Sequence, residues 1–575
     1  MSMVTIYIDG NKYSVPQGMT VLQACRMNNI YIPTLCYHPD LTPAGACRLC
    51  VVEVNTSKTL VASCVYPVAN DMVVQTNSAR VRKARKTIVE LLLANHPKDC
   101  LTCQKSGNCE LQKVAQELGV RKIRFDEGER RHHAKDESNP SLVRDPEKCI
   151  LCGRCVRVCS EVQGMNVYGF QKRGFNTLVA PAFDCGLGEV ACSLCGQCST
   201  VCPTGAIVER DDTEKVWNAI NDPEKIVLVQ MAPSVRVALG EEMGMPAGSI
   251  VTGKMVAALR KMGFDYVFDV NFAADLTIME EGYEFIHRLK NSGVLPMITS
   301  CSPGWVNTLE LKYPGLIPHL STAKSPQGMF GAIAKTYFAK KANIDPAKIV
   351  TVSVMPCTAK KYEAARDELC DSGFRDIDVV ITTRELGRMM RSLNIDFASL
   401  KEENFDSPLG ASTGAAAIFG TTGGVMEAAL RTVAEVVTGK SFDKVDYQQV
   451  RGMAETREAV IPVGDLQVKV AVVNTLKAAQ EMCKRVVAGT ADYHFIEIMA
   501  CPGGCIGGGG QPLPVDYSKR VLRQKAIMQI DADSLIRKSH ENPEIKTLYN
   551  EFLGEPLGEL SHKLLHTTYK SRQKR

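Results

Sequence analysis

Two short stretches decide how the chain is organised: residues 149–159 read CILCGRCVRVC, and residues 192–203 read CSLCGQCSTVCP. Both place cysteines at a C-x2-C-x2-C-x3-C spacing, and the second continues into proline. In such a pair of runs, each fourth cysteine ligates the other of two four-iron clusters. We therefore assign one cluster to Cys149, Cys152, Cys155 and Cys202, and the other to Cys192, Cys195, Cys198 and Cys159.

A further cysteine group lies toward the N-terminus, at Cys36, Cys47, Cys50 and Cys64. The close pair in the middle suits a tight turn around one iron, and the outer two would close the other side. The group resembles a two-iron ferredoxin loop, although its first interval of ten residues is longer than the plant-type interval of four. Four thiolates also suit tetrahedral zinc, which stays an alternative here.

The next group mixes one imidazole with three thiols: His96, Cys100, Cys103 and Cys109. His96 precedes Cys100 by about one helical turn, which favours a ligand over an ordinary core histidine. We expect a [4Fe-4S] cluster here. Imidazole in place of thiolate leaves such a cluster less negative and raises its potential.

Composition limits the class of protein. The 575 residues carry a net charge of +5 and are 45% hydrophobic, which excludes wholesale disorder and a nucleic-acid-coating protein. The N-terminus alternates apolar and charged residues and reads as a strand, and no apolar run reaches the roughly 18 residues of a membrane span. We expect a cytoplasmic protein that contacts neither membrane nor nucleic acid, because 23 cysteines are typical of metal sites in a reducing compartment.

The cysteine distribution predicts a multidomain α/β protein. Seventeen cysteines lie before residue 203, and a charged segment follows at 209–215. We predict an N-terminal β-grasp ferredoxin domain (1–80) with a hairpin and a helix at 21–27, a His/Cys cluster domain (81–125), and a two-[4Fe-4S] ferredoxin-like domain (126–212) that opens with a linker at 125–145. The remainder, 213–575, alternates β-like and helical stretches (helices expected at 254–262 and 383–393), which favours two parallel α/β lobes. The basic tail 570–575 is predicted to be frayed.

Three motifs stand out in the C-terminal part: TSCSPGW at 299–305, MPCTAKKYE at 355–363 and MACPGGCIGGGG at 499–510. Cys357 follows a β-like run, at a strand end where α/β proteins form sites. Glycines beside Cys501 and Cys505 let the backbone approach a bulky group. With four iron–sulfur groups upstream, a metal site is favoured over buried structural cysteines.

Together these motifs resemble the [FeFe]-hydrogenases, whose signatures are TSCCPxW, MPCxxKxxE and MACxGGCxxGGG. The resemblance extends over nearly the whole chain, including the segment RKSHENP at 537–543. It implies interconversion of H2 with protons and electrons at an H-cluster, in which a four-iron cubane is joined through a cysteine to a two-iron subcluster carrying CO, cyanide and a dithiolate. One [2Fe-2S] and three accessory [4Fe-4S] clusters would carry the electrons.

The resemblance also implies roles for individual residues. Cys357, Cys501 and Cys505 match cubane ligands, with Cys505 as the bridge to the two-iron unit, and Lys360 matches a cyanide contact. The residues expected to line the subcluster are Pro233, Ser234, Gln327, Met355 and Met499. Those expected on a proton path to solvent are Cys301, Glu281, Ser321, Glu284 and Arg288. On spacing alone, the helix face of Glu281, Glu284 and Arg288 would read as a solvated ion-pair stripe.

One position departs from the family pattern. The fourth cubane ligand of the family is the second cysteine of TSCCP, and this chain has Ser302 there. Ser302 ligates through oxygen, Cys301 takes over the ligand role, or the cubane is compromised; the sequence leaves these three open. A neutral hydroxyl is a poor ligand for soft iron–sulfur chemistry.

Electrons would be exchanged with a ferredoxin or with flavin- and NAD(P)-binding partner subunits, because the chain has no dinucleotide fingerprint of its own. Separate maturases would install the two-iron unit. The alternative function is a non-catalytic electron-transfer, sensory or iron–sulfur assembly protein on the same scaffold, an alternative that Ser302 keeps open. Cys25, Cys185, Cys370 and Cys483 match no ligand position and read as small apolar residues.

Overall fold

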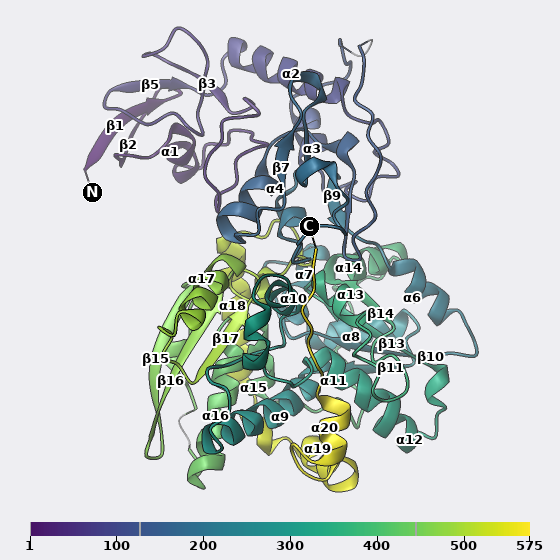
Figure 1. The fold of residues 1–575 in the computed structure, drawn as a ribbon. Coiled ribbons are helices and arrows are strands. Elements are labelled where there is room, and N and C mark those ends of the chain that lie inside the picture. Colours follow the sequence, from purple (N-terminus) through teal and green to yellow (C-terminus); the bar gives the residue numbers. More distant parts are fainter. Residues whose placement is uncertain (1, 126–127, 443–444, 575) are drawn as a thin grey trace. The chain divides into compact units, whose positions relative to one another are not determined.

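We describe the protein from a computed structural model, in which residues 2–125, 128–442 and 445–574 are described. The chain forms two compact units (Figure 1). The smaller unit comprises Met1–Glu161, Asn166–Val190 and Val201–Val208, and the larger comprises Val162–Met165, Ala191–Thr200 and Glu209–Arg575. The first three cysteines of the second repeat therefore belong to the larger unit, whereas the first repeat belongs to the smaller one.

The smaller unit begins with a five-stranded sheet in the order β2-β1-β5-β3-β4. Its strands are β1 (Met3–Ile8), β2 (Asn11–Pro16), β3 (Val51–Val54), β4 (Val61–Ala62) and β5 (Met72–Gln75). β1 and β2 form the expected hairpin, and β1 runs parallel to β5. Ile6, Ile8 and Val15 are buried against α1 (Val21–Met27), which Thr20 caps. The predicted hairpin and helix are confirmed.

The rest of the smaller unit is built from short elements around the cysteine groups. These are α2 (Ala79–Ala94), α3 (Glu110–Glu117), α4 (Arg154–Arg157), β6 (Leu142–Arg144) paired with β9 (Ile207–Glu209), and β7 (Gly169–Gln171) paired with β8 (Leu178–Ala180). The prediction of a linker at 125–145 is wrong for the second half of that segment. Residues 126–127, in its first half, lie outside the described ranges. Arg144 is buried there, and its guanidinium donates to the carbonyl of Val179 and to Asp136. These contacts tie the segment to the unit.

The larger unit contains a four-stranded sheet in the order β11-β10-β13-β14, with every pair parallel. The strands are β10 (Ile226–Met231), β11 (Tyr266–Asp269), β13 (Ile349–Met355) and β14 (Val379–Thr382). Buried side chains of this sheet share one core with α8 (Thr252–Lys261), α9 (Val270–Lys290), α11 (Pro326–Ile333) and α14 (Thr383–Ser392). The expected parallel layer is confirmed, as are the helices predicted at 254–262 and 383–393, to within two residues.

A second sheet in the larger unit has the order β12-β17-β16-β15. Its strands are β12 (Met297–Ile298), β15 (Thr456–Val463), β16 (Leu466–Asn474) and β17 (Phe495–Met499). β12, β17 and β16 are parallel, but β15 returns antiparallel to β16. Only Gly464 and Asp465 separate β15 from β16, and a two-residue connection joins antiparallel strands only. The prediction of purely parallel layers is therefore wrong for this edge.

The remaining helices surround these two sheets (Figure 1). They are α6 (Thr213–Ile220), α7 (Leu239–Glu242), α10 (Pro303–Lys312), α12 (Ala339–Lys341), α13 (Ala359–Ala364), α15 (Gly414–Ala417), α16 (Gly424–Thr438), α17 (Leu476–Val487), α18 (Tyr517–Asp533), α19 (Pro543–Leu548) and α20 (Glu559–Leu565), while α5 (Gln197–Val201) carries Cys198.

The C-terminal tail is not frayed throughout, contrary to the prediction. Arg572 Nε donates to Glu310 Oε2 at 2.9 Å, and Lys570 Nζ lies 2.7 Å from Glu368 Oε1. Glu310 is fully buried and already paired with Arg366, so Arg572 adds a second guanidinium to this carboxylate and fixes the tail. Sequence reasoning missed these contacts because their acidic partners lie more than 200 residues away.

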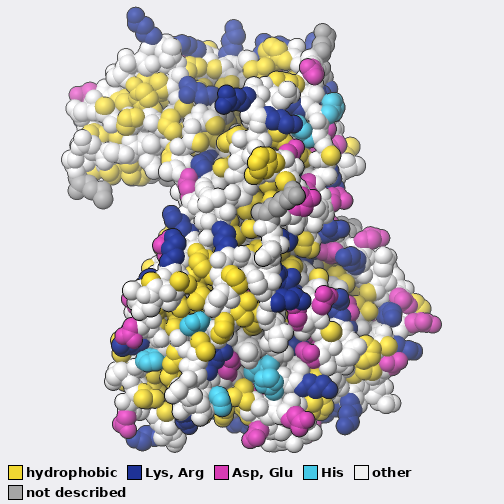
Figure 2. Space-filling view, viewed as in Figure 1, with side chains coloured by type: hydrophobic (Ala, Val, Ile, Leu, Met, Phe, Trp, Pro, Cys, Tyr) yellow, Lys and Arg dark blue, Asp and Glu magenta, His cyan; other side chains and the backbone are white. Residues whose placement is uncertain are grey.

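None of the described helices is long and apolar enough to cross a membrane. Acidic and basic side chains are interspersed on the face of the larger unit that Figure 2 shows.

Candidate functional site

A cavity of about 800 Å³ lies in the larger unit, where strands of both sheets end. Cys357 follows β13, Cys501 follows β17, Pro233 follows β10, and Cys301 follows β12. The carboxyl ends of parallel strands are where open α/β folds form sites. Parallel sheets thus bring together the three cysteine motifs, which are far apart in the sequence.

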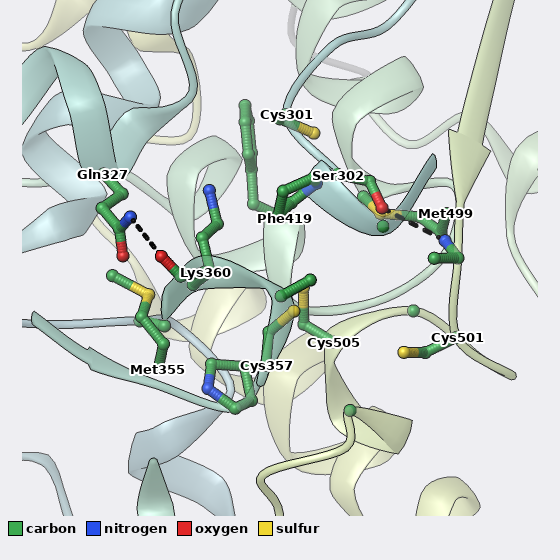
Figure 3. Close-up of a pocket in the computed structure, with 18 of the residues that line it drawn as sticks. Cys301, Ser302, Gln327, Met355, Cys357, Lys360, Phe419, Met499, Cys501 and Cys505 are labelled. Atoms are coloured by element: carbon green, nitrogen blue, oxygen red, sulfur yellow. Dashed lines mark hydrogen bonds between the residues drawn. The ribbon is translucent and has the colours of Figure 1, made fainter. Parts of the chain in front are cut away.

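Three thiols define one side of this cavity: Cys357, Cys501 and Cys505 (Figure 3). Burial raises the pKa of Cys357 to about 11 and that of Cys505 to about 12, while Lys360 partly offsets both shifts. Burial likewise holds the pKa of Cys501 well above its ordinary value. Bare thiolates are therefore disfavoured here. A bound metal reverses this, because its charge deprotonates a coordinating thiol outright.

The glycine run holds the Cys505 loop against the Cys357 loop. A Cβ on Gly508 would lie 2.2 Å from the carbonyl oxygen of Pro356, closer than any side chain can come. Gly504 has φ +86, a conformation that residues with a Cβ rarely adopt. The glycines therefore bring Cys505 next to Cys357, as Figure 3 shows.

Lys360 and Gln327 form a polar wall opposite the thiols. Lys360 Nζ donates to Ser325 Oγ at 2.8 Å and to Glu363 Oε2 at 2.7 Å. Gln327 Nε2 donates to the same Glu363 oxygen at 2.9 Å, but Gln327 Oε1 is buried and has no hydrogen-bond partner among the described residues. A fixed ammonium and an unpaired amide oxygen are arranged to meet a polar or anionic group inside the cavity.

The other predicted lining residues are Pro233, Met355 and Met499, and all three border the cavity. Ser234 is fully buried beside Pro233, but it does not border the cavity, and its Oγ accepts from Gln511 Nε2 at 3.2 Å. Sequence reasoning missed Phe419, which borders the cavity from the run GAAAIFGTTGG at 414–424. The small residues of this run were the sequence signal that could have identified it as part of the cavity wall.

Residues of the predicted proton path form a buried chain beside the cavity. Glu281 and Glu284 lie on α9 and are only 1% and 8% exposed. Ser321 Oγ donates to Glu284 Oε2 at 2.8 Å, and Arg288 Nη2 donates to Glu284 Oε1 at 2.6 Å. The interpretation as a solvated ion-pair stripe, which spacing alone favoured, is therefore wrong. Spacing shows which residues share a face of the helix, but it does not show whether other segments cover that face.

Glu281 is buried on the same helix and lies near both Glu284 and the cavity-lining Cys301. Burial raises its pKa to about 8, and the nearby charge of Glu284 adds to the shift. Neither oxygen of Glu281 has a hydrogen-bond partner among the described residues. The pKa of Cys301 is raised well above its ordinary value, first by burial and then by the charge of Glu281. Glu281 can thus hold or release a proton near neutral pH, next to a thiol on the cavity wall.

A second cavity, of about 420 Å³, lies in the smaller unit and is lined by four cysteines: Cys149, Cys152, Cys155 and Cys202. Three come from the first repeat and the fourth from the end of the second, which is the exchange that the spacing predicts. Burial raises the pKa of Cys149 to about 11 and that of Cys152 to about 12. Three buried cysteines and the half-buried Cys149 around one hollow fit a four-iron cluster.

The thiols of the first cysteine group also converge. Cys36 is within hydrogen-bonding reach of Cys47 and Cys64, and Cys64 is within reach of Cys50. The amide of Cys47 donates to the sulfur of Cys36 at 3.5 Å. These contacts fit a small cluster held by all four sulfurs.

In the His/Cys group, His96 is nearly buried, and its Nδ1 has no hydrogen-bond partner among the described residues. Burial lowers the pKa of His96 to about 4, so the ring is neutral and able to ligate a metal. Cys103 and Cys109 lie near each other, whereas Cys100 is exposed. In the remaining group, Cys159 belongs to the smaller unit and Cys192, Cys195 and Cys198 to the larger, so their shared cluster stays a prediction.

Several thiol-lined sites and one larger cavity beside a buried carboxylate indicate the class: an iron–sulfur oxidoreductase. Comparison with family models agrees. The iron only hydrogenase large subunit, C-terminal domain, matches residues 225–509, and the iron hydrogenase small subunit matches 517–572. A 2Fe-2S iron-sulfur cluster binding domain, an NADH-ubiquinone oxidoreductase-G iron-sulfur binding region and a 4Fe-4S dicluster domain match 1–79, 85–124 and 148–206.

Comparison with individual relatives narrows the class of protein further. The chain is 53% identical to the NADP-reducing hydrogenase subunit HndD of Solidesulfovibrio fructosivorans, over all of both chains. It is 40% identical to iron hydrogenase 1 of Clostridium pasteurianum, over 99% of this chain and 100% of that one. A variant of the apo [FeFe]-hydrogenase HydA1 from Chlamydomonas reinhardtii matches with a TM-score of 0.57 and 42% identity, over 63% of this chain and 99% of that one. The chain belongs to the iron-only, or [FeFe], hydrogenase family: it is an oxidoreductase that acts on H2 and carries accessory iron–sulfur domains.

Proposed function

We propose that the cavity of the larger unit holds the H-cluster and is where H2 is interconverted with two protons and two electrons. The observation that carries this proposal is the meeting of Cys357, Cys501 and Cys505 around one hollow, with a glycine run between them. Beyond the thiols, the wall of this hollow continues to Lys360, Gln327 and Met355, in keeping with a cubane plus a second unit. When bound, the two-iron unit supplies an open iron position and a base for H2.

The chain's own residues position and shield this chemistry. Lys360 presents its ammonium to the cavity while Ser325 and Glu363 fix its direction, so it suits a cyanide ligand. Pro233, Met355, Met499 and Phe419 add apolar walls that exclude water. Exclusion of water strengthens each polar contact inside the chamber.

Protons reach the chamber through side chains on α9 and the loop beside it. Cys301 exchanges a proton with the interior of the cavity, and Glu281 exchanges it with Cys301. Ser321 and Glu284 carry it onward toward the surface. Arg288 stays protonated and positions Glu284, and its guanidinium also donates to the carbonyls of Pro318 and Leu320. The pKa of about 8 at Glu281 lies close to working pH, which favours transfer in both directions.

Electrons pass through one [2Fe-2S] and three accessory [4Fe-4S] clusters in this proposal. The two-iron cluster takes Cys36, Cys47, Cys50 and Cys64; the others take His96, Cys100, Cys103 and Cys109; Cys149, Cys152, Cys155 and Cys202; and Cys192, Cys195, Cys198 and Cys159. Arg157 supports a close approach of two of these sites, since its guanidinium donates to the carbonyls of Cys36 at 2.6 Å and Cys152 at 3.4 Å.

The electron partner is proposed to be an NADP-linked, flavin-containing subunit, with a small ferredoxin as the alternative. The relative that matches over the full length of both chains is an NADP-reducing hydrogenase subunit, and this supports a multisubunit setting. Cytoplasmic location and dependence on maturases belong to the same proposal.

Coexpression with maturases tests the function. The purified full chain is expected to show infrared bands of CO and cyanide, and to reduce a viologen dye with H2. Cluster-loaded protein with neither bands nor turnover would contradict the proposal and favour an electron-transfer role.

A further inference from the structure

The cubane cavity supplies three thiols for a cluster with four corners. A [4Fe-4S] cubane takes one terminal ligand at each iron, and four cysteines are the usual set. Cys357, Cys501 and Cys505 account for three corners, so a fourth donor must come from another polar side chain of the wall. The remaining candidates on the wall are Cys195, Cys301 and Ser302. This inference rests on the proposed function, because it concerns the cluster proposed for this cavity.

Two of these candidates are committed elsewhere. Cys301 lies beside Glu281, and the proton route proposed above uses its thiol. Cys195 sits within the C-x2-C-x2-C run, where its thiol interacts with the side chain of Ser193. Cys195 is likewise proposed above as a ligand of another cluster, which leaves Ser302.

Ser302 has the geometry that the fourth corner needs. It occupies the N-cap position of α10, where a serine normally accepts from its own helix, yet its side chain makes no such bond. Ser302 Oγ instead accepts from the amide of Ala500, at 3.2 Å, directly before Cys501 (Figure 3). The oxygen is thus turned from the helix toward the loop that carries two of the three thiols.

The missing side-chain cap of α10 costs little stability, so the Ser302 side-chain oxygen is available for another contact. Pro303 occupies the first helical position and has no N–H to satisfy, and the amides of Trp305 and Val306 both reach the carbonyl of Ser302, at 3.0 Å. The backbone of Ser302 therefore starts the helix, and its side chain is not needed for that.

We propose that Ser302 Oγ is the fourth ligand of the cubane, bound as an alkoxide. The O–H bond is replaced by an O–Fe bond, and the proton is released to solvent during cluster insertion, so no electrons are exchanged. An alkoxide carries the same single negative charge as a thiolate, so the charge of the site is unchanged. It is a harder donor than sulfur and favours the more oxidised iron. The reduction potential of this cubane is therefore lower than that of an all-cysteine one.

The test uses the full-length protein expressed without maturases, so that the cubane and accessory clusters form and no two-iron unit is present. The wild type is compared with Ser302→Cys and Ser302→Ala by iron content and by electron paramagnetic resonance during a redox titration. Signals of the accessory clusters serve as an internal check that each variant folds. The expected results are a shift of one cubane signal to higher potential in Ser302→Cys, and its loss or an altered spectrum in Ser302→Ala.

Two further variants separate the possible failures. Cys301→Ala is expected to keep the wild-type cubane signal; if it loses that signal while Ser302→Ala keeps an unchanged one, Cys301 is the ligand and the proposal is overturned. An unchanged signal and potential in both serine variants also overturns it. Cys357→Ala must lose the cubane signal in any case. If it does not, the failure lies with the proposed function and not with Ser302.

Discussion

The two cavities of this protein are both lined by cysteines, but they differ in what surrounds the sulfur. The cavity of the smaller unit has four thiols and, apart from Arg144 and Asp145, few charged groups on its wall. The cavity of the larger unit adds an ammonium, an unpaired amide oxygen and a neighbouring carboxylate whose pKa burial raises to about 8. Thiols alone hold a cluster that passes electrons. Bond chemistry needs space for a reactant and a route for its protons.

The largest effect is expected when the larger cavity loses a thiol. Cys501→Ala removes a proposed cubane ligand and should lower H2-dependent viologen reduction by more than the roughly 10–100-fold typical of losing a group outside the ligand set. Cys483→Ala is the matched control, because Cys483 is equally buried but lies on α17 away from the cavity. If the two variants had equal activity, a cysteine of the cavity would matter no more than a buried cysteine elsewhere, and the prediction would be contradicted.

The proton route is tested by two adjacent glutamates. Glu281→Gln should slow turnover by about 10²–10⁴-fold, because an amide cannot pass a proton, and it should remove the apparent pKa near 8 from the pH profile. Glu280→Gln is the control: its carboxylate is also fully buried but binds Tyr549, His566 and the amide of Leu557. That variant should lose roughly 1–3 kcal/mol of stability and keep its specific activity. Similar pH profiles for both variants would contradict the route.

A smaller effect is expected at the ammonium wall. Lys360→Met should reduce turnover by about 10–100-fold and weaken retention of the two-iron unit, measured by the intensity of the CO and cyanide bands. Lys361 offers a comparison, since its Nζ points to Asp212 and Glu385 instead of the cavity. Lys361→Met should lower the melting temperature but leave the bands of the folded fraction unchanged. If Lys361→Met lost the bands and Lys360→Met kept them, the role proposed for Lys360 would belong to Lys361, and the prediction would be contradicted.

The smallest effect concerns the scaffold of the larger unit. Burial raises the pKa of Asp275 to about 7, so the folded state keeps a proton that the unfolded chain releases near 3.8. Its stabilising contribution is complete below about pH 4 and is lost as pH rises to about 7. Wild-type protein should therefore lose about 2–4 °C in melting temperature relative to Asp275→Asn over that range. A pH-independent difference between the two proteins would contradict the assignment.

The sequence predicted best what repeats or alternates along the chain. The hairpin of β1 and β2, helix α1 and the strand before Cys357 follow from short-range patterns, and the structure has them. The cysteine spacing also predicted that Cys202 would join Cys149, Cys152 and Cys155, which share one cavity. Ligand spacing is informative because a cluster fixes the distances between its ligands.

What the sequence did not predict depends on contacts between distant residues. The burial of Glu281 and Glu284, the place of Phe419 in the cavity wall and the pairing of Arg572 with Glu310 all depend on which segments pack together. Spacing on a helix identifies neighbours on that helix only. For Ser302, the sequence marked the departure, but the direction of its oxygen required the structure.

Exchange between H2 and heavy water tests most directly the claim that reaction and electron transport occupy separate sites. This reaction needs the chamber and its proton route but no net electron transfer. Cys152→Ala, which alters the smaller cavity, should keep the exchange and lose much of its H2-dependent electron transfer, whereas Cys501→Ala should lose both. Exchange that persists in Cys501→Ala, or that disappears in Cys152→Ala with the cubane still present, would contradict the account.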